Sequence, residues 1–280
     1  MTSHKIATAD TTTDRPDPTT TQDLWFQSQG VRLYAKTQGQ GRPLVFLHGG
    51  LADHRAALVR VGSLADSLRV LAPDLRGSGR SHYAGELSWD LLADDLRALL
   101  HSLHIERAVI GGTSMGSAVA LRFALRYPGH TAGLVLWAPV YPGADRGLTA
   151  PQIAAMQAMA AAGERARVEG TQALVPLYQA LPADLRQRAL DMLREFDAAS
   201  VAATTAFLAQ NAQPMAEASA LAAIAAPTLI VPGTDPEHPR EVATLYAQHL
   251  QRPTLLDPQS PDLLAQLAQF CEGSSWGSEA

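Results

Sequence analysis

Residues 108–127 read AVIGGTSMGSAVALRFALRY, and this stretch decides the fold. The apolar run 108–111 predicts a strand buried on both faces, and the run 115–127 has the spacing of a helix. Between them, Gly112-Thr113-Ser114-Met115-Gly116 matches G-x-S-x-G. A sharp strand-to-helix turn forces strained backbone geometry on the serine, so small residues two places before and after it prevent clashes. We therefore expect the Ser114 hydroxyl to project at a helix N-terminus, where backbone N–H groups stabilise developing negative charge.

The same alternation of strand and helix continues on both sides of this turn. An antiparallel hairpin is expected at 24–28 and 31–36, and further strands at 43–47, 69–72, 133–138, 228–231 and 254–256. Helices are expected at about 53–68, from 88 onward, at 241–250 and at 261–270. This rhythm predicts an α/β fold, with an eight-stranded, mostly parallel sheet and helices on both faces.

The helix that follows Ser88 has a clear amphipathic pattern. Ser88 is a good N-cap, and leucines recur at three- and four-residue spacing from Leu92 to Leu103. This pattern places Asp94, Asp95 and Arg97 on the outer, solvent-facing side.

The alternation stops between the sixth and seventh strands. Residues 142–220 are rich in Ala, Leu, Met and Gln, which predicts a helical cap inserted into a core formed by 23–141 and 221–272. Residues 1–22 are rich in Thr, Asp and Pro and are expected to form a disordered tail, and 273–280 a flexible C-terminus.

Composition excludes several classes of function. The net charge is −5 and no run of Lys and Arg exists, so nucleic acid is not an expected partner. Cys271 is the single cysteine and has no ligand partners at zinc spacing, so neither a disulfide, a metal nor a cofactor is expected. No stretch approaches the ~20 apolar residues that cross a bilayer. We expect a cytoplasmic monomer or homodimer that acts on a small-molecule substrate and does not bind a membrane.

A second loop points to the same chemistry as the Ser114 turn. His48-Gly49-Gly50-Leu51 follows an expected strand, and its glycines let a backbone N–H approach a substrate carbonyl oxygen. Gly50 and Met115 would then supply the two donors of an oxyanion hole. We interpret His48 as structural, holding the loop by hydrogen bonds.

Together with a third motif, these loops resemble the α/β-hydrolase superfamily, in the branch of capped esterases, enol-lactonases and meta-cleavage-product hydrolases. The third motif is Asp74-Leu75-Arg76-Gly77-Ser78-Gly79-Arg80-Ser81, similar to the family's D-x-R-G-x-G-x-S loop, where Asp74 and Arg76 are expected to fix the turn by local hydrogen bonds. The resemblance covers about residues 28–270. It implies the α/β-hydrolase fold and a serine nucleophile at Ser114.

The resemblance also implies a triad acid after the seventh strand, where Asp235 lies. A carboxylate at that strand end can orient an imidazole and stabilise its cation. Asp145, after the sixth strand, is a second place where the family sometimes carries its acid.

The family's histidine, by contrast, is missing from its usual place after the eighth strand. Residues 254–262 read TLLDPQSPD, with Ser260 near the expected position, and no histidine follows His249. An alcohol is a weak nucleophile without a base, and general-base help is worth roughly 10²- to 10⁴-fold. The candidates for a replacement base are His238, three residues after Asp235, and His82, just beyond the glycine loop.

Two functions follow from these motifs. The first is a serine hydrolase that acts on a small ester, lactone or thioester through Ser114, with an impaired or rearranged base. The second is a non-hydrolytic member of the fold, either a lyase or cyclase or a ligand-binding pseudoenzyme. A replaced histidine, or a strand count that is off, is a third explanation of the gap. The distance from Ser114 to the nearest imidazole discriminates among these readings.

Overall fold

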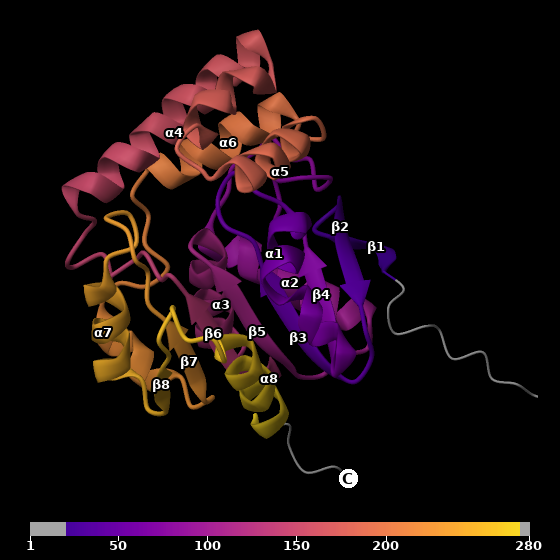
Figure 1. Ribbon diagram of the computed structural model, residues 1–280, viewed down its shortest axis with the longest axis vertical. Coiled ribbons are helices and arrows are strands. Elements are labelled where there is room, and N and C mark those ends of the chain that lie inside the picture. The colour runs from indigo at the N-terminus through magenta and orange to yellow at the C-terminus, as the bar shows by residue number, and fades with distance from the viewer. Residues whose placement is uncertain (1–20, 275–280) are drawn as a thin grey trace, which may run out of the picture.

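The computed structural model describes residues 21–274, which form a single eight-stranded sheet with helices on both faces (Figure 1). The strand order is β1-β2-β4-β3-β5-β6-β7-β8, and β2 is antiparallel to both of its neighbours while all later pairs are parallel. The expected hairpin and mostly parallel sheet are therefore confirmed. The strands are β1 (Gln22–Ser28), β2 (Val31–Gln38), β3 (Arg42–Leu47), β4 (Leu68–Pro73), β5 (Ala108–Thr113), β6 (Thr131–Trp137), β7 (Thr228–Val231) and β8 (Pro253–Leu255).

The helices alternate with these strands except between β6 and β7, where three α-helices follow one another. The α-helices are α1 (His54–Val61), α2 (Trp89–Ser102), α3 (Met115–Arg126), α4 (Ala150–Glu169), α5 (Ala183–Leu193), α6 (Ala198–Ala209), α7 (Arg240–His249) and α8 (Leu263–Gly273). The short 3₁₀ segments are η1 (Gly62–Asp66), η2 (Pro128–His130), η3 (Thr171–Tyr178) and η4 (Ala218–Ala223). None of the described helices is long and apolar enough to cross a membrane.

Successive residues of the central strands enter different cores, because side chains alternate between the faces of a sheet. Val45 and Leu47 of β3 pack with α2, α3 and α7, whereas Leu44 and Phe46 pack with α1 and α8. All four side chains are fully buried. This explains why the central strands read as continuous apolar runs rather than as alternating ones.

Some expected boundaries are wrong by small amounts. The helix expected at 53–68 ends at Val61 and continues as the 3₁₀ turn η1. The first strand already begins at Gln22 and α8 runs to Gly273, so these two residues belong to the folded part. The remainder of the two expected flexible ends, 1–20 and 275–280, lies outside the described residues.

The placement of Asp95 on the solvent side of α2 is also wrong. Ser88 caps the helix as expected, accepting a hydrogen bond from the Leu91 N–H. Asp95, however, is only 4% exposed and pairs with Arg76, with N–O distances of 2.6 and 2.9 Å. Arg76 is therefore held by a distant helix and not by local bonds in its own loop. The periodicity of the helix alone carries no information about this buried cation.

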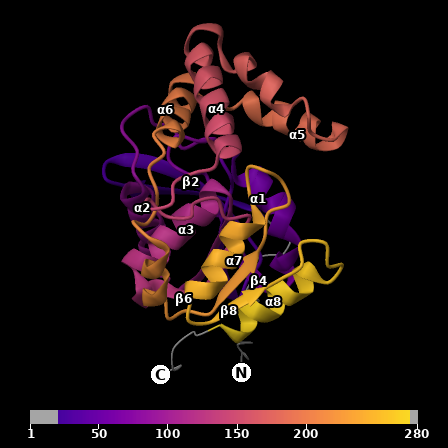
Figure 2. The same cartoon turned by 90° about the vertical axis from the view of Figure 1, so that its left-hand side faces the viewer.

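Helices α4 to α6, residues 150–209, are called here the helical insertion. They lie beyond one end of the sheet, as both views show (Figures 1 and 2). Leu174 and Leu193 of the insertion belong to a small core that also contains Leu51, from the loop after β3. The insertion's Met156, Phe207 and Leu208 nevertheless belong to the main core beside α2 and α3. The insertion is thus packed onto the sheet domain and shares side chains with it.

Candidate active site

The turn between β5 and α3 has the strained geometry that its sequence predicts. Ser114 has a positive φ of 54°, with ψ at −117°, in a region that residues with a Cβ rarely adopt. A Cβ on Gly112 would lie 2.5 Å from the backbone of Gly116, and one on Gly116 would lie 2.5 Å from the His48 carbonyl oxygen. Close backbone contact therefore requires glycine at both positions. Ser114 lies midway between them, at the apex of the turn.

The Ser114 hydroxyl lies within hydrogen-bond distance of an imidazole. Its Oγ is 2.9 Å from Nε2 of His238, and Nδ1 of the same ring is 2.8 Å from Oδ1 of Asp235. Asp235 and His238 both come from the loop between β7 and α7. The structure therefore brings together the three residues that sequence reasoning named as nucleophile, acid and candidate base.

The loop 235–238 organises itself around one carboxylate oxygen. Oδ1 of Asp235 accepts from the backbone N–H groups of Glu237 and His238 at 3.0 and 2.9 Å, in addition to the imidazole. The Asp235 side chain is 52% exposed and that of His238 is 20% exposed. Both side chains are therefore partly in contact with solvent.

The other candidates lie elsewhere. Ser260, at the position where the family carries its histidine, accepts from the Asp262 N–H and the Gln266 side chain. His82 is exposed and does not line the cavity at Ser114. Asp145 is exposed, and its carboxylate lies 3.9 Å from Arg146. His249 bonds to the Leu245 carbonyl within α7.

Gly50 and Met115, the expected oxyanion donors, line the same cavity as Ser114 and His238. Met115 is the first residue of α3, so its N–H has no acceptor within the helix. The loop that carries Gly50 is held from the helical insertion, because the Tyr178 hydroxyl donates to the Leu51 carbonyl at 2.8 Å. Leu51 itself has a positive φ of 54°.

His48 holds this loop from below. The Leu75 N–H donates to its Nε2 at 3.0 Å, so that nitrogen carries no proton, and Nδ1 donates to the Gly49 carbonyl at 2.7 Å. Burial keeps the pKa of His48 below its usual range, although the nearby Asp74 carboxylate acts in the opposite direction. Its hydrogen bonds thus fix His48 as a neutral imidazole that joins two loops.

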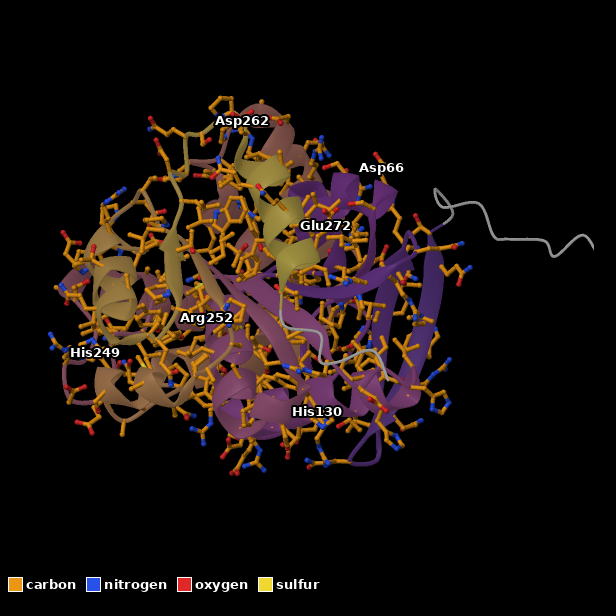
Figure 3. The ribbon with its side chains drawn as sticks, turned by 90° about the horizontal axis from the view of Figure 1, so that it is seen from below. Asp66, His130, His249, Arg252, Asp262 and Glu272 are labelled. Carbon is orange, nitrogen blue, oxygen red and sulfur yellow. The ribbon has the colours of Figure 1, made fainter. Side chains whose placement is uncertain are left out.

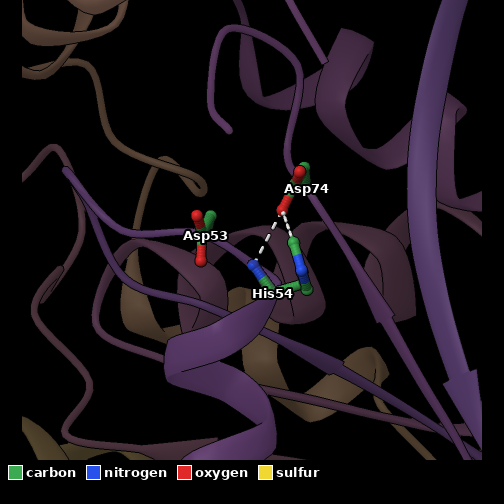
Figure 4. A group of neighbouring side chains, drawn as sticks. All are labelled: Asp53, His54 and Asp74. Carbon is green, nitrogen blue, oxygen red and sulfur yellow. Dashed lines mark hydrogen bonds and ion pairs between the residues drawn. The ribbon is translucent and has the colours of Figure 1, made fainter. Parts of the chain in front are cut away.

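A second buried cluster lies in the same region and consists of Asp53, His54 and Asp74 (Figure 4). Oδ1 of Asp74 accepts from the backbone N–H and the Nδ1 of His54, as the dashed lines show, and Oδ2 accepts from the Arg80 N–H. Asp53 instead binds the Arg55 guanidinium at 2.6 Å.

The bonds to Asp74 also affect its ionisation. Burial alone would raise the pKa of Asp74, but the hydrogen bond and charge of His54 outweigh it and hold that pKa below its usual range. In residues 21–274 this cluster is the grouping that most resembles a set of metal ligands. Protein donors occupy its oxygens, so it serves to fix the turn after β4.

The cavity at Ser114 has a volume of about 160 Å³. Its walls come from the strand-end loops on one side and from the helical insertion on the other, and they are mainly apolar: Gly50, Met115, Val140, Tyr141, Gln152, Ala155, Met156, Met159, Leu208 and Glu237, beside Ser114 and His238. A larger cavity of about 700 Å³ lies near the end of α2, and it is not lined by Ser114, Asp235 or His238.

Sequence reasoning missed the hydrogen bonds that two polar residues of the insertion make to the loops around this site. Gln152 and Tyr178 bond to backbone carbonyls of the strand-end loops from a separate part of the chain. The capping box formed by Thr149 and Gln152 signals only the start of α4, and no local pattern identifies the partners of Tyr178.

Comparison with known proteins shows similarity to hydrolases over part of the chain. The chain is 37% identical over 101 residues to AB hydrolase superfamily protein YisY of Bacillus subtilis (strain 168), which is 35% of this chain and 38% of that protein. It is 34% identical over 112 residues to 2-hydroxymuconate semialdehyde hydrolase of Pseudomonas sp. (strain CF600), covering 38% and 40% of the two chains. The matched stretch thus spans about two fifths of these relatives.

The fold itself matches over a longer range. A thermophilic esterase from Thermogutta terrifontis superimposes with a TM-score of 0.70 at 24% identity, over 89% of this chain and 96% of the other. A model of the alpha/beta hydrolase family matches residues 44–265. This range includes the loops that carry Gly50 and His238, the turn at Ser114 and the whole insertion. The chain belongs to the alpha/beta hydrolase family.

Proposed function

We propose that the protein is a serine hydrolase that cleaves a small ester, lactone or thioester through an acyl-enzyme at Ser114. His238 is the general base and Asp235 is the acid that orients it. The observation that carries this proposal is the continuous chain of hydrogen bonds from Ser114 Oγ through the His238 ring to Asp235, at 2.9 and 2.8 Å. These distances meet the requirement for proton transfer from a nucleophile to a positioned base.

In the first half of the reaction, Ser114 Oγ attacks the substrate carbonyl carbon while His238 Nε2 takes the hydroxyl proton. Asp235 accepts a hydrogen bond from Nδ1–H of His238, which keeps the proton on Nδ1, leaves Nε2 free to act as the base and stabilises the imidazolium that forms. The oxyanion of the tetrahedral intermediate is bound by the N–H groups of Gly50 and Met115. His238 then returns the proton to the leaving alcohol or thiol, and the acyl group remains on Ser114.

In the second half, water takes the place of the leaving group. His238 accepts a proton from this water, the resulting hydroxide attacks the acyl carbon, and the proton passes to Ser114 Oγ as the acid departs. A lactone follows the same steps, except that its leaving hydroxyl stays attached to the acyl group.

The cavity supports a small and uncharged acyl group. Its volume of about 160 Å³ is below the roughly 300–1,000 Å³ of pockets for drug-sized ligands. Val140, Met156, Met159 and Leu208 offer it an apolar surface, and no Lys or Arg is among the described residues that line it. We propose that the helical insertion acts here as a cap that sets the length of the acyl chain.

The alternative, a lyase, cyclase or binding protein with an unused serine, rests on the missing histidine. The contact between His238 and Ser114 speaks against that reason, because it supplies an imidazole within hydrogen-bond distance at the end of a different strand. No observation in residues 21–274 favours the alternative over the hydrolase.

Two measurements on the purified full chain test the proposal. A fluorophosphonate should label one residue, identified by mass spectrometry as Ser114, and Ser114→Ala should abolish the label. Hydrolysis of p-nitrophenyl acetate should fall by about 10²- to 10⁴-fold in His238→Ala, since the base is lost. A folded protein that neither reacts with the fluorophosphonate nor turns over the acetate would refute acyl transfer and leave the non-hydrolytic reading.

A further inference from the structure

Gln152 is a buried amide at the start of the helical insertion. It is the third residue of α4 and is 1% exposed. Its Nε2 donates to two backbone carbonyls, those of Val140 at 2.8 Å and Glu237 at 3.2 Å. Its Oε1 accepts from the backbone N–H and the hydroxyl of Thr149 at 2.9 and 3.0 Å. The two carbonyl partners require the NH₂ group on their side, so the orientation of the amide is fixed by its neighbours.

The two carbonyls belong to different strand-end loops. Val140 follows β6, and Glu237 follows β7 and directly precedes His238 in the chain. One side chain of the insertion therefore connects both loops, and it also lines the cavity that contains Ser114. The amide bonds to the peptide group that links Glu237 to His238.

The His238 loop needs such a connection because, apart from the contact with Ser114, its other described hydrogen bonds are local. The backbone and ring of His238 bind only Asp235 and Ser114, and Asp235 is 52% exposed. Below the loop, Gly233 is in close contact with His238, since a Cβ there would lie 2.1 Å from the His238 carbonyl oxygen. The contact at Gly233 comes from within the same loop, whereas the bond from Gln152 to Glu237 comes from the helical insertion.

We propose that Gln152 is a positioning residue that holds His238 in reach of Ser114 through the Glu237 carbonyl. This inference rests on the proposed role of His238 as the base. It assigns to the helical insertion a part in catalysis beyond shaping the cavity, because the start of α4 fixes the loop that carries the base. Small displacements of a catalytic group are costly, since about 1 Å can lower a rate by 10²-fold.

The test compares steady-state hydrolysis of p-nitrophenyl acetate in wild type and in Gln152→Met, which has similar length but no donor. We expect kcat to fall about 10- to 100-fold, with KM within about twofold of wild type, because the base is displaced while the pocket remains. The same substitution added to His238→Ala should cause no further loss, since a residue that acts through His238 has no effect without it.

Gln157→Met provides the matched control, because Gln157 is exposed on the same helix. It should leave kcat and KM unchanged. Gln152→Ala covers a Met variant that does not fold, since the small side chain cannot overpack the site and likewise has no donor for the Glu237 carbonyl. It should lose kcat at pH 8 in the same way, and a wild-type kcat in this variant would overturn the proposal.

Other outcomes separate the positioning role from its rivals. A rise in KM with unchanged kcat would show that Gln152 contacts substrate, and an equal loss in the His238→Ala background would show that it acts independently of His238. Either result overturns the inference but leaves the proposed function intact. By contrast, wild-type activity in His238→Ala alone would refute the base itself, and the inference would fail with it.

Discussion

At the scale of single residues, the unusual feature is that the proposed acid, Asp235, and the proposed base, His238, lie three residues apart in one loop. Oδ1 of Asp235 is held by the N–H groups of Glu237 and His238 as well as by the imidazole. Because two backbone N–H groups point at Oδ1, the side-chain atom at this place must be a hydrogen-bond acceptor, in an Asp235→Asn variant as well as in the wild type. The tautomer of His238 is thus set partly by the backbone of its own loop.

This arrangement predicts an unusually mild effect of Asp235→Asn. The backbone donors should hold the Asn carbonyl oxygen at the Oδ1 position, so that Nδ1 of His238 keeps its acceptor and only the charge is lost. Because the carboxylate is 52% exposed, its charge is already screened by solvent. We expect kcat to fall about 10- to 100-fold, compared with the roughly 10⁴-fold loss where Asn imposes the wrong tautomer.

Asp235→Ala is the comparison for that measurement. It removes both the acceptor and the turn, so its kcat should fall further than that of Asp235→Asn. Equal and large losses in the two variants, measured with p-nitrophenyl acetate, would show that the Asn amide has flipped and that the backbone does not control it.

His48 makes the stability of the fold depend on pH. Burial lowers the pKa of His48, so between that value and about 6.5 the unfolded chain binds a proton that the folded chain does not. The contribution of neutral His48 to the free energy of unfolding is fully present above about pH 6.5. It is lost as the pH falls below that value, at up to ~1.4 kcal/mol per pH unit. Urea unfolding of wild type and His48→Asn at pH 5 to 7 measures this contribution.

His48→Asn should be less stable at pH 7, by about 1–3 kcal/mol, because the Leu75 N–H loses its buried acceptor. Its free energy of unfolding should also change less steeply between pH 7 and 5, by about one proton. Parallel pH profiles for the two proteins would show that His48 binds its proton equally well in the folded and unfolded chain, contrary to the effect of its burial.

At the scale of elements, the turn from β5 to α3 depends on how closely it approaches the end of β3. A Cβ on Gly116 would lie 2.5 and 2.7 Å from the carbonyl oxygens of His48 and Leu47. Alanine is otherwise favoured over glycine within a helix by about 1 kcal/mol. The clash decides the sign, since neither carbonyl can move without disturbing the loop that carries Gly50.

Gly116→Ala should therefore lower the free energy of unfolding by about 1–3 kcal/mol, as overpacking does, and slow labelling of Ser114 by a fluorophosphonate. Gly129→Ala is the matched control, because a Cβ there meets nothing within 4 Å. It should be neutral or slightly stabilising in urea unfolding. Normal stability and labelling in Gly116→Ala would mean that α3 can shift away from β3 without cost.

The elements that sequence predicts well are those whose cause is local. The glycines around Ser114 and the Ser88 cap act within a few residues, so their patterns can be read directly. Asp95 was misplaced because its partner Arg76 lies 19 residues away in another loop. Burial of a charge depends on such distant pairing, and the helical period does not contain it.

The candidate site was predictable to the same extent. Asp235 and His238 could be named as candidates, but the contact of His238 with Ser114 spans 124 residues and depends on how the loop after β7 turns. Gln152 could not be identified, because its partner carbonyls lie 12 and 85 residues away and a backbone carbonyl leaves no trace in the sequence.

At the scale of the whole molecule, the site occupies the end of the sheet where the helical insertion is attached (Figures 1 and 2). The opposite end, seen in Figure 3, carries charged and ionisable side chains of both signs that are spread over it rather than grouped. The labelled residues there are Asp66, His130, His249, Arg252, Asp262 and Glu272. The two ends of the sheet therefore differ because the helical insertion covers only one of them.

The insertion should unfold together with the sheet rather than as a separate lid. Phe207 of α6 is 3% exposed, and its ring packs edge-on against Trp89 of α2 at 4.9 Å, inside the main core. Differential scanning calorimetry should therefore show one transition, with equal calorimetric and van't Hoff enthalpies. Phe207→Ala should cost about 3–5 kcal/mol and move that whole transition down, whereas Val168→Ala, at an exposed position of α4, should not move it. Two transitions, of which Phe207→Ala lowers only one, would mean that the insertion opens independently and that its hold on the His238 loop is released before the sheet unfolds.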